Sequence, residues 1–225
     1  MNYGSLNKLP AAFTPAPNQM CHFHLFWPYA MNKLTLDTNC IIDLEEDRPD
    51  GVFVREIVQA WKDGRIELAV VAVSASENQK SGIANSHFLE FEKKLENVGL
   101  AGVVHLLPLM KWDLFYWDHA LWSDAEKEEL ATAIQKVLFP NTQFEPPQDI
   151  KQKSDWRNKQ CDVLTAWSHV FHKWDYLVTR DANFHRHKDA LRELGVFGIL
   201  HPKDAVKLCQ VSIEHSHQVQ PPLTA

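Results

Sequence analysis

The sequence holds four acidic residues whose placement could support metal-dependent chemistry. Asp37, Glu77 and Asp181 each follow a short apolar segment, and Asp162 lies beside Cys161, close to the apolar stripe of a helical segment. Ligands gather outside the carboxyl ends of the strands in open α/β sheets. If a parallel sheet brings these strand ends together, the four carboxylates share one pocket, where their like charges repel. A hard divalent cation resolves that conflict, and oxygen-only ligands favour Mg²⁺ or Mn²⁺ over zinc.

Each of these acidic residues also has a structural explanation. Asp37 could simply cap the helix that follows it, since Asp is a favoured N-cap residue. Glu77 could complement the helix dipole in a first helical turn, and Glu90 and Glu92 lie on the same expected helix. Asp162 is costly to bury unless it is paired or hydrogen-bonded. The residues alone leave these alternatives open.

Strand and helix patterns alternate along the chain and would position the acidic residues. Strands are expected at residues 34–36, 66–73, 103–107, 176–179 and 196–200. Helices are expected at residues 41–46, 52–61, 74–98, 123–138, 155–171, 186–194 and 202–208. A helix between two buried strands implies a parallel βαβ unit. The pattern predicts a three-layer α/β/α fold with a mainly parallel central sheet.

We expect one folded domain over residues 32–210, with residues 110–154 as an inserted helical and loop subregion that includes a loop at 140–154. Residues 1–31 are expected to form a poorly structured N-terminal extension, and residues 211–225 a flexible tail. Because Met31 directly precedes the first strand, one hypothesis is that it is the true initiator.

Composition limits the classes of function. The net charge of −6 and the isoelectric point near 6.0 give no global attraction for polyanions, so nucleic-acid binding would need a local basic surface or metal ions. The four cysteines show no CxxC spacing, which is typical of a reduced intracellular protein. The longest apolar run, residues 68–73, is too short to cross a bilayer. We therefore expect a cytoplasmic protein.

Three further features could contact a ligand. The aromatic residues of segment 110–122 could stack on unpaired bases, although such a cluster more often belongs to the core. The three HxH pairs lack a third ligand at a useful spacing, which favours surface histidines. A local basic patch is a weak candidate for substrate binding, with a solvated surface as the alternative. It consists of Lys151, Lys153, Arg157 and Lys159.

The order of these motifs resembles the PIN domain, a metal-dependent nuclease fold. The resemblance spans about residues 33–208 and rests on four pieces. These are DTN at 37–39, Glu77 after the second expected strand, CDVL at 161–164 and TRDANF at 179–184. Each piece alone is weak, but four acidic residues in this order on a βαβ pattern are much more specific.

The resemblance implies an endoribonuclease that hydrolyses RNA phosphodiester bonds with metal-activated water. The implied catalytic and metal-binding residues are Asp37, Glu77, Asp162 and Asp181. Asn39, Thr179 and Asn183 would stand behind these ligands, where they could orient the carboxylates or bind water. Asn183 stands where PIN domains often carry a further acid, so a fifth ligand there would be weak.

The resemblance also bears on partners. Small PIN proteins are often toxins that a partner protein neutralises, so an RNA substrate and an inhibitory protein partner are both implied. The segment 110–154 is longer than compact PIN domains require and could shape substrate choice or pair two protomers. The alternative function is a catalytically inactive PIN-fold module that binds RNA or protein. The presence of all four acidic residues argues against that alternative.

Overall fold

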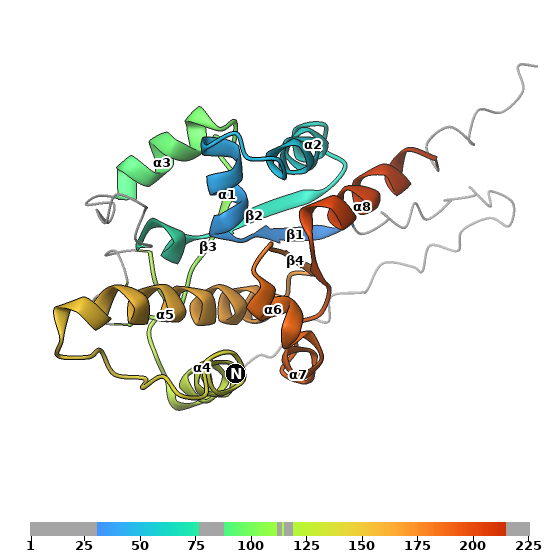
Figure 1. Ribbon diagram of the computed structural model, residues 1–225. Helices are drawn as coiled ribbons and strands as arrows, with labels where there is room; N and C mark the ends of the chain where they lie inside the picture. The colour runs from blue at the N-terminus through green and yellow to red at the C-terminus, as the bar shows by residue number, and fades with distance from the viewer. Residues whose placement is uncertain (1–30, 77–87, 112–113, 115–118, 215–225) are drawn as a thin grey trace, which may run out of the picture. The chain divides into compact units, whose positions relative to one another are not determined.

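Five parallel strands form one sheet in the computed structural model, which describes residues 31–76, 88–111, 114 and 119–214 (Figure 1). Along the sheet the strand order is β3-β2-β1-β4-β5. The strands are β1 (Lys33–Leu36), β2 (Glu67–Val71), β3 (Val104–Leu106), β4 (Tyr176–Val178) and β5 (Ile199–Leu200). Every neighbouring pair is parallel, which confirms the expected α/β class.

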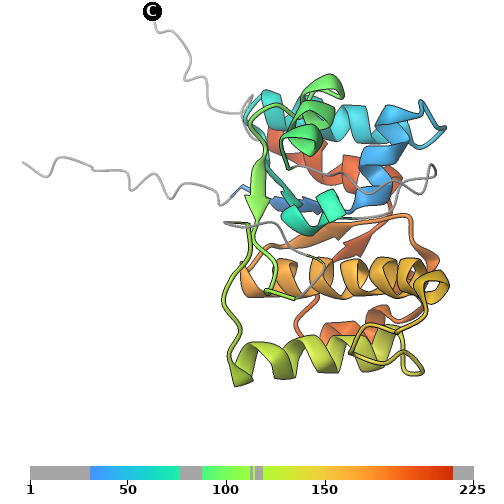
Figure 2. The same cartoon turned by 90° about the vertical axis from the view of Figure 1, so that its left-hand side faces the viewer.

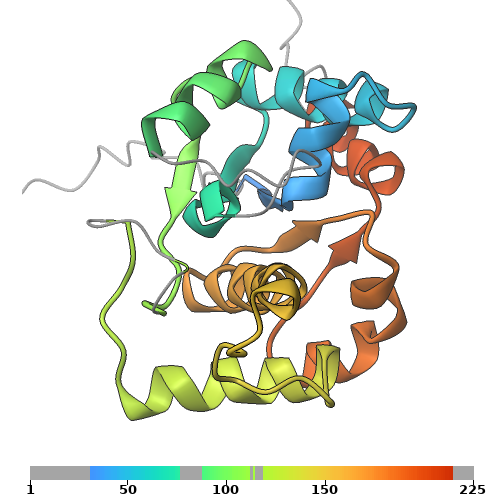
Figure 3. The ribbon, with the colours of Figure 1, turned by 60° about the vertical axis from the view of Figure 1, so that its left-hand side comes forward.

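Helices pack around this sheet in two layers (Figures 1 and 2). One layer contains α1 (Thr38–Glu45), α2 (Gly51–Lys62), α3 (Phe88–Asn97) and α8 (Pro202–Glu214). The other contains α4 (Ala125–Leu138), α5 (Ile150–Phe171), α6 (Ala182–Arg186) and α7 (Lys188–Glu193). Figures 2 and 3 show α5 between the sheet and α4. The three-layer prediction is therefore confirmed.

The strands are apolar on both faces because both faces are covered. In β2, Leu68 and Val70 belong to the hydrophobic core shared with α1, α2, α3 and α8. Ala69 and Val71 alternate with them and belong to the core shared with α4, α5, α6 and α7. Strands that are buried on both faces are typical of parallel sheets.

The centre of the sheet is a point where the strand order reverses. From β1 the chain builds β2 and β3 on one side and later β4 and β5 on the other. Leu36 and Val178 are register partners at the carboxyl ends of β1 and β4, and the backbone N–H of Asp37 donates to the Val178 carbonyl at 3.0 Å. The residues that follow these two strands therefore start side by side.

Several expected element boundaries were wrong, and the three main differences concern β2, α5 and α6. Strand β2 ends at Val71 and a 3₁₀ helix (Ala72–Ser76) follows it, where the β-branched pattern predicted a strand to residue 73 and then a helix to residue 98. Here the Thr38 hydroxyl donates to the Ser74 hydroxyl at 2.7 Å, so a tertiary contact overrides local propensity. The rest of that expected helix is α3, apart from residues 77–87, which lie outside the described residues.

The other two corrections concern the second half of the chain. Helix α5 begins at Ile150, inside the expected loop 140–154, because its first residues follow the prolines and are good helix formers. The expected helix 186–194 is two short helices, α6 and α7. The first begins at Ala182 because the Asp181 side chain caps it by accepting from the Asn183 N–H.

Within the residues that the structure describes, no helix combines the length and the apolar character that a membrane span requires. Cys40, Cys161 and Cys209 are buried thiols.

Candidate active site

A polar cavity of about 280 Å³ opens at the carboxyl ends of β1 and β4. Its lining comes from three parts of the chain that are far apart in sequence: the start of α1, the middle of α5 and the segment after β4. The lining residues are Asp37, Asn39, Ile42, Asp162, Arg180 and Asp181. Three of the four predicted acidic residues thus meet at one place.

Asp37 is the most buried carboxylate of the cavity, with 2% of its surface exposed. One of its oxygens accepts from the Thr38 N–H at 2.8 Å. The other accepts from Asn39 Nδ2 at 2.5 Å and from Thr179 Oγ1 at 2.6 Å. Asp37 is also the N-cap residue of α1. The capping role and the placement in the cavity, which the sequence left as alternatives, therefore occur together.

Burial raises the pKa of Asp37 to about 6. The hydrogen bonds from Thr179, Thr38 and Asn39 lower the pKa by stabilising the charged form, and the nearby charge of Asp181 raises it. The buried charge is thus stabilised by donors but is opposed by a second carboxylate. A cation bound beside Asp37 would favour its ionised form.

Asp181 is held in place through Thr179. Its backbone N–H donates to Thr179 Oγ1 at 2.9 Å, the same hydroxyl that donates to Asp37. One oxygen of the Asp181 side chain accepts from the Asn183 N–H at 2.7 Å. A single buried hydroxyl therefore links the backbones and side chains at the ends of the two central strands.

The remaining predicted acidic residues differ in where they lie. Asp162 is half-buried on α5 and lines the cavity. Glu77 lies outside the described residues. Glu90 and Glu92 lie on α3 and do not line the cavity. Among the described residues, no three His, Cys, Asp or Glu side chains are close enough together to hold a metal ion by themselves.

The three residues expected to orient the carboxylates play unequal parts. Asn39 contacts Asp37 and also donates to Thr179 Oγ1 at 2.9 Å, while its Oδ1 accepts from the Arg180 N–H at 3.0 Å. The side chain of Asn183 instead donates to the Leu138 carbonyl at 3.0 Å, at the end of α4. Asn183 thus contacts Asp181 through its backbone only.

The predicted basic patch lies on the first half of α5, away from the cavity lining. Lys159 pairs with Asp155 at 2.6 Å on the same helix. Lys153 and Arg157 are half-buried, and the side chain of Lys151 is not described. Lys153, Arg157 and Lys159 do not line the acidic cavity, and the role of the patch in substrate binding stays a prediction.

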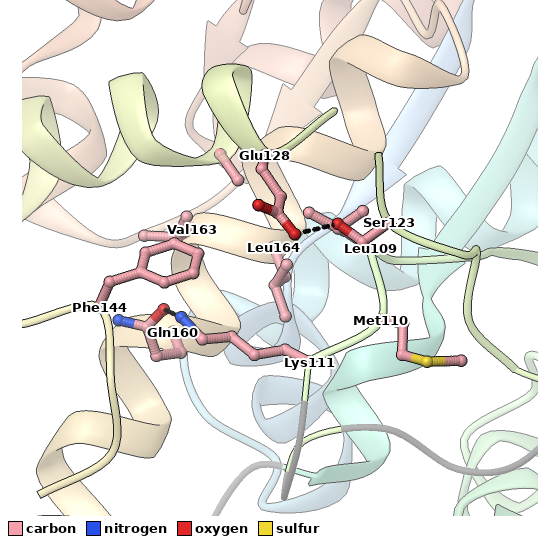
Figure 4. A pocket seen from close by; sticks show the side chains of 10 residues that line it. Leu109, Met110, Lys111, Ser123, Glu128, Phe144, Gln160, Val163 and Leu164 are labelled. Atoms are coloured by element: carbon pink, nitrogen blue, oxygen red, sulfur yellow. Dashed lines mark hydrogen bonds between the residues drawn. The ribbon is translucent and has the colours of Figure 1, made fainter. Parts of the chain in front are cut away.

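A second, smaller cavity of about 30 Å³ lies between α4, α5 and the segment around Met110 (Figure 4). There Lys111 donates to Gln160 Oε1, and its Nζ lies 3.2 Å from the centroid of the Phe144 ring. Burial lowers the pKa of Lys111 to about 8. The space holds about one water molecule, and the contact joins Lys111 to Gln160 on α5.

The aromatic residues of segment 110–122 are only partly described. Trp122 is 76% exposed. Trp112, Phe115 and Trp117 lie outside the described residues. Base stacking by this segment remains a prediction.

Sequence reasoning missed two residues next to the carboxylates. Arg180 lines the cavity, and its Nε donates to Asp43, a fully buried carboxylate on α1. The only signal for Arg180 was its place between Thr179 and Asp181. No spacing rule pairs it with Asp43, because the two are 137 positions apart.

Comparisons of the chain with known protein families, with curated proteins and with solved structures gave no significant match. The function of the chain has to be inferred from its own residues.

Proposed function

We propose that the chain is a PIN-like, metal-dependent endoribonuclease that hydrolyses RNA at the cavity lined by Asp37, Asp162 and Asp181. One observation carries the proposal: three carboxylates from three separate segments line a single polar cavity at the carboxyl ends of the central strands. Open α/β sheets usually bind their ligands at this place, where the strand order reverses. The order of the four acidic residues in the sequence supports the same activity.

The donor atoms fit a hard divalent cation. All the charged ligands are carboxylates, which Mg²⁺ and Mn²⁺ prefer, and burial raises the pKa of Asp37, whose anion a cation would stabilise. Because the described side chains do not form a complete site, further oxygen ligands would come from water and, in this proposal, from Glu77. When bound, Mg²⁺ or Mn²⁺ would lower the pKa of a water molecule and offset the charge of the attacked phosphate.

The chain's own residues would hold the reacting groups in place. Asp37 is fixed by three hydrogen bonds, and Asp181 is fixed by the Asn183 N–H, so two carboxylates keep their positions without help from substrate. Such preorganisation is what metal-assisted hydrolysis requires from a protein. A water oxygen would form a new bond to phosphorus and an RNA P–O bond would break, leaving one product with a terminal phosphate and one with a hydroxyl group.

A binding module without catalysis is the second candidate. It is favoured by the absence, within the described residues, of a compact group of three metal-binding side chains. Such a module would have the same fold as the nuclease and would bind RNA or protein. Binding would not need the carboxylates to be charged.

Cleavage of a labelled single-stranded RNA pool in Mn²⁺, Mg²⁺ and EDTA distinguishes the two candidates. We expect metal-dependent cleavage by the wild-type chain and a loss of about 100-fold or more in Asp181→Asn and Asp162→Asn. Asn remains a good N-cap residue, so Asp181→Asn should keep α6 in place. Asp189→Asn is the matched control, because it removes an exposed carboxylate of α7 and changes the net charge equally.

The outcomes separate the candidates. Cleavage lost in both cavity variants and kept in Asp189→Asn supports the nuclease. Cleavage that survives both substitutions contradicts it and indicates a contaminating enzyme. No cleavage by the folded wild-type chain favours the binding module, which retention of the RNA pool on a filter would then support.

A further inference from the structure

Arg180 provides positive charge to a cavity that is otherwise acidic. It is the one basic residue among the cavity-lining residues that the structure describes, and it stands in sequence between Thr179 and Asp181. Its backbone N–H donates to Asn39 Oδ1 at 3.0 Å, so its main chain is fixed to the same network as Asp37. The position of Arg180 is therefore set by the site itself.

The Nε side of the Arg180 guanidinium is held by carboxylates of the protein itself. Its Nε donates to Asp43 Oδ2, and Nε lies 3.9 Å from Asp50 Oδ2. The Asp43 side chain has no exposed surface, and its second oxygen lies 3.7 Å from the Arg48 guanidinium. A guanidinium carries five N–H donors in a planar fork. With Nε bound to Asp43, the two terminal nitrogens are the donors that Arg180 can offer to a ligand.

The anchor depends on a close approach of two helices. Gly51 begins α2, and a Cβ atom added there would lie 2.6 Å from the Asp43 carbonyl oxygen on α1. The absence of a side chain at Gly51 therefore lets α2 bring Asp50 towards Asp43 and Arg180. Asp43 lies within α1 and Asp50 is the N-cap residue of α2, and residues on or at the end of a helix are positioned more firmly than residues in loops.

A phosphodiester would be repelled by a cavity with three carboxylates unless positive groups contact its oxygens. Guanidinium matches phosphate geometry, because two parallel N–H donors reach two oxygens at once. Arg180 combines this chemistry with a fixed position and a side chain that is 26% exposed. A surface arginine without an anchor would lose more side-chain entropy on binding.

We infer that Arg180 binds the non-bridging oxygens of the scissile phosphate, and that Asp43 is the positioning residue that holds its guanidinium at the cavity. This inference rests on the proposed nuclease function and names one residue that recognises its substrate. The alternative is that Arg180 only ties the end of β4 to α1. The two roles differ in what they predict for turnover.

Substitution of Arg180 tests the contact directly. Arg180→Gln should lower kcat for RNA cleavage in Mn²⁺ about 100-fold, with a smaller change in KM, as for other donors to a developing oxyanion. Arg180→Lys keeps the charge but loses the fork and should recover only part of the rate. Arg186→Gln is the matched control, because Arg186 is exposed at the end of α6 and its loss changes the net charge equally.

Chemical rescue distinguishes the two roles, because added guanidinium ion would not restore cleavage if Arg180 had only a structural role. Added guanidinium ion should restore part of the cleavage by Arg180→Ala at concentrations that leave the wild-type rate unchanged. Thermal melting of each variant shows whether the fold is intact. If Arg180 were only a tether, melting temperatures would fall while the rate of the folded fraction stayed at the wild-type value.

A double-mutant cycle tests the role of Asp43. Asp43→Asn alone should lower kcat because the guanidinium is no longer held. In the Arg180→Gln background it should have little further effect, because a positioning residue acts through the group it positions. Independent, multiplicative losses in the double variant would overturn the positioning role. If Asp43→Asn fails to fold, the Arg180 variants still decide the main contact.

The controls separate this inference from the proposed function. If the wild-type chain cleaves RNA, Asp181→Asn does not, and Arg180→Gln cleaves at the wild-type rate, the nuclease stands and the Arg180 assignment is overturned. If the folded wild-type chain does not cleave at all, the proposed function fails and the assignment fails with it. A selective loss in Arg180→Gln with rescue of Arg180→Ala by guanidinium supports both.

Discussion

Thr179 Oγ1 donates a 2.6 Å hydrogen bond to Asp37 Oδ2, and this contact joins the carboxyl ends of β4 and β1. The same hydroxyl accepts from Asn39 Nδ2 and from the Asp181 N–H, both at 2.9 Å. One buried side chain therefore fixes the relative positions of two carboxylates and an amide. Residues that orient catalytic carboxylates in this way are often nearly as important as the carboxylates themselves.

Thr179→Val should lower both stability and activity. Valine keeps the shape of threonine but leaves Asp37, Asn39 and the Asp181 N–H without their shared partner. We expect the free energy of unfolding to fall by about 1–3 kcal/mol and RNA cleavage to fall about 10- to 100-fold. Urea denaturation and the cleavage rate in Mn²⁺ measure the two effects.

Thr165→Val is the control for that substitution. Thr165 is fully buried on α5, and its hydroxyl has no hydrogen-bond partner in the part of the chain that the structure describes. Removing an unsatisfied buried hydroxyl should leave stability unchanged or raise it. A loss as large as that of Thr179→Val would contradict the importance given to the Thr179 contacts.

His169 should make stability depend on pH. It is fully buried, its Nδ1 lies 3.0 Å from Thr35 Oγ1, and burial lowers its pKa from 6.5 to about 4. The unfolded chain therefore takes up a proton on this ring as pH falls below 6.5, while the folded chain does not until about pH 4. The neutral ring favours folding above pH 6.5, and this contribution is lost as pH falls towards 4.

Comparison with His169→Gln isolates this effect. The wild-type chain should lose about 3 kcal/mol of unfolding free energy relative to the variant between pH 6.5 and pH 4. Urea denaturation at several pH values provides the difference, and other titrating groups cancel because both proteins carry them. A difference that does not change with pH would show that His169 does not have the lowered pKa.

Mn²⁺ should stabilise the folded chain through the cavity. A ligand that binds only the folded state raises the melting temperature, and the rise grows with ligand concentration above the Kd. We expect a Mn²⁺-dependent rise that EDTA reverses, that is smaller in Asp181→Asn and that is unchanged in Asp189→Asn. An equal rise in all three proteins would place Mn²⁺ binding elsewhere on the chain.

Gly51→Ala should disturb the contact between α1 and α2. The new Cβ would lie 2.6 Å from the backbone oxygen of Asp43, and backbone cannot move aside as a flexible side chain can. We expect a loss of about 1–3 kcal/mol in the free energy of unfolding, as for other cases of overpacking. The neighbouring exposed residue provides the control, because Val52→Ala should change stability little. Equal stability of the two variants would contradict the close approach.

The fold class was predictable because short apolar segments, typical of buried strands, alternate with helical segments along the chain. The short apolar segments before Asp37 and Asp181 are strands, and both carboxylates lie at strand ends because parallel strands finish at one edge of a sheet. The position of Asp162 in the cavity lining was predictable from its place near the apolar stripe of a long helix. These inferences needed only the sequence and the geometry of a βαβ unit.

What could not be predicted depends on contacts between distant segments. Arg180 and Asp43 meet only because α1 packs beside the end of β4, and the 3₁₀ helix after β2 is held by Thr38 and Ser74. Local propensity contains no information about either contact. The role of Glu77, an inhibitory partner, pairing of two protomers and cytoplasmic location stay predictions from the sequence.

The rate of RNA cleavage in Mn²⁺ by Asp181→Asn, relative to Asp189→Asn, tests the central claim most directly. Both variants lose one carboxylate, but only Asp181 lines the acidic cavity. A metal-dependent nuclease at this cavity predicts a rate at least about 100-fold lower in Asp181→Asn, with both variants folded and EDTA abolishing the activity of the control. Equal rates in the two variants would contradict the claim that this cavity is the active site.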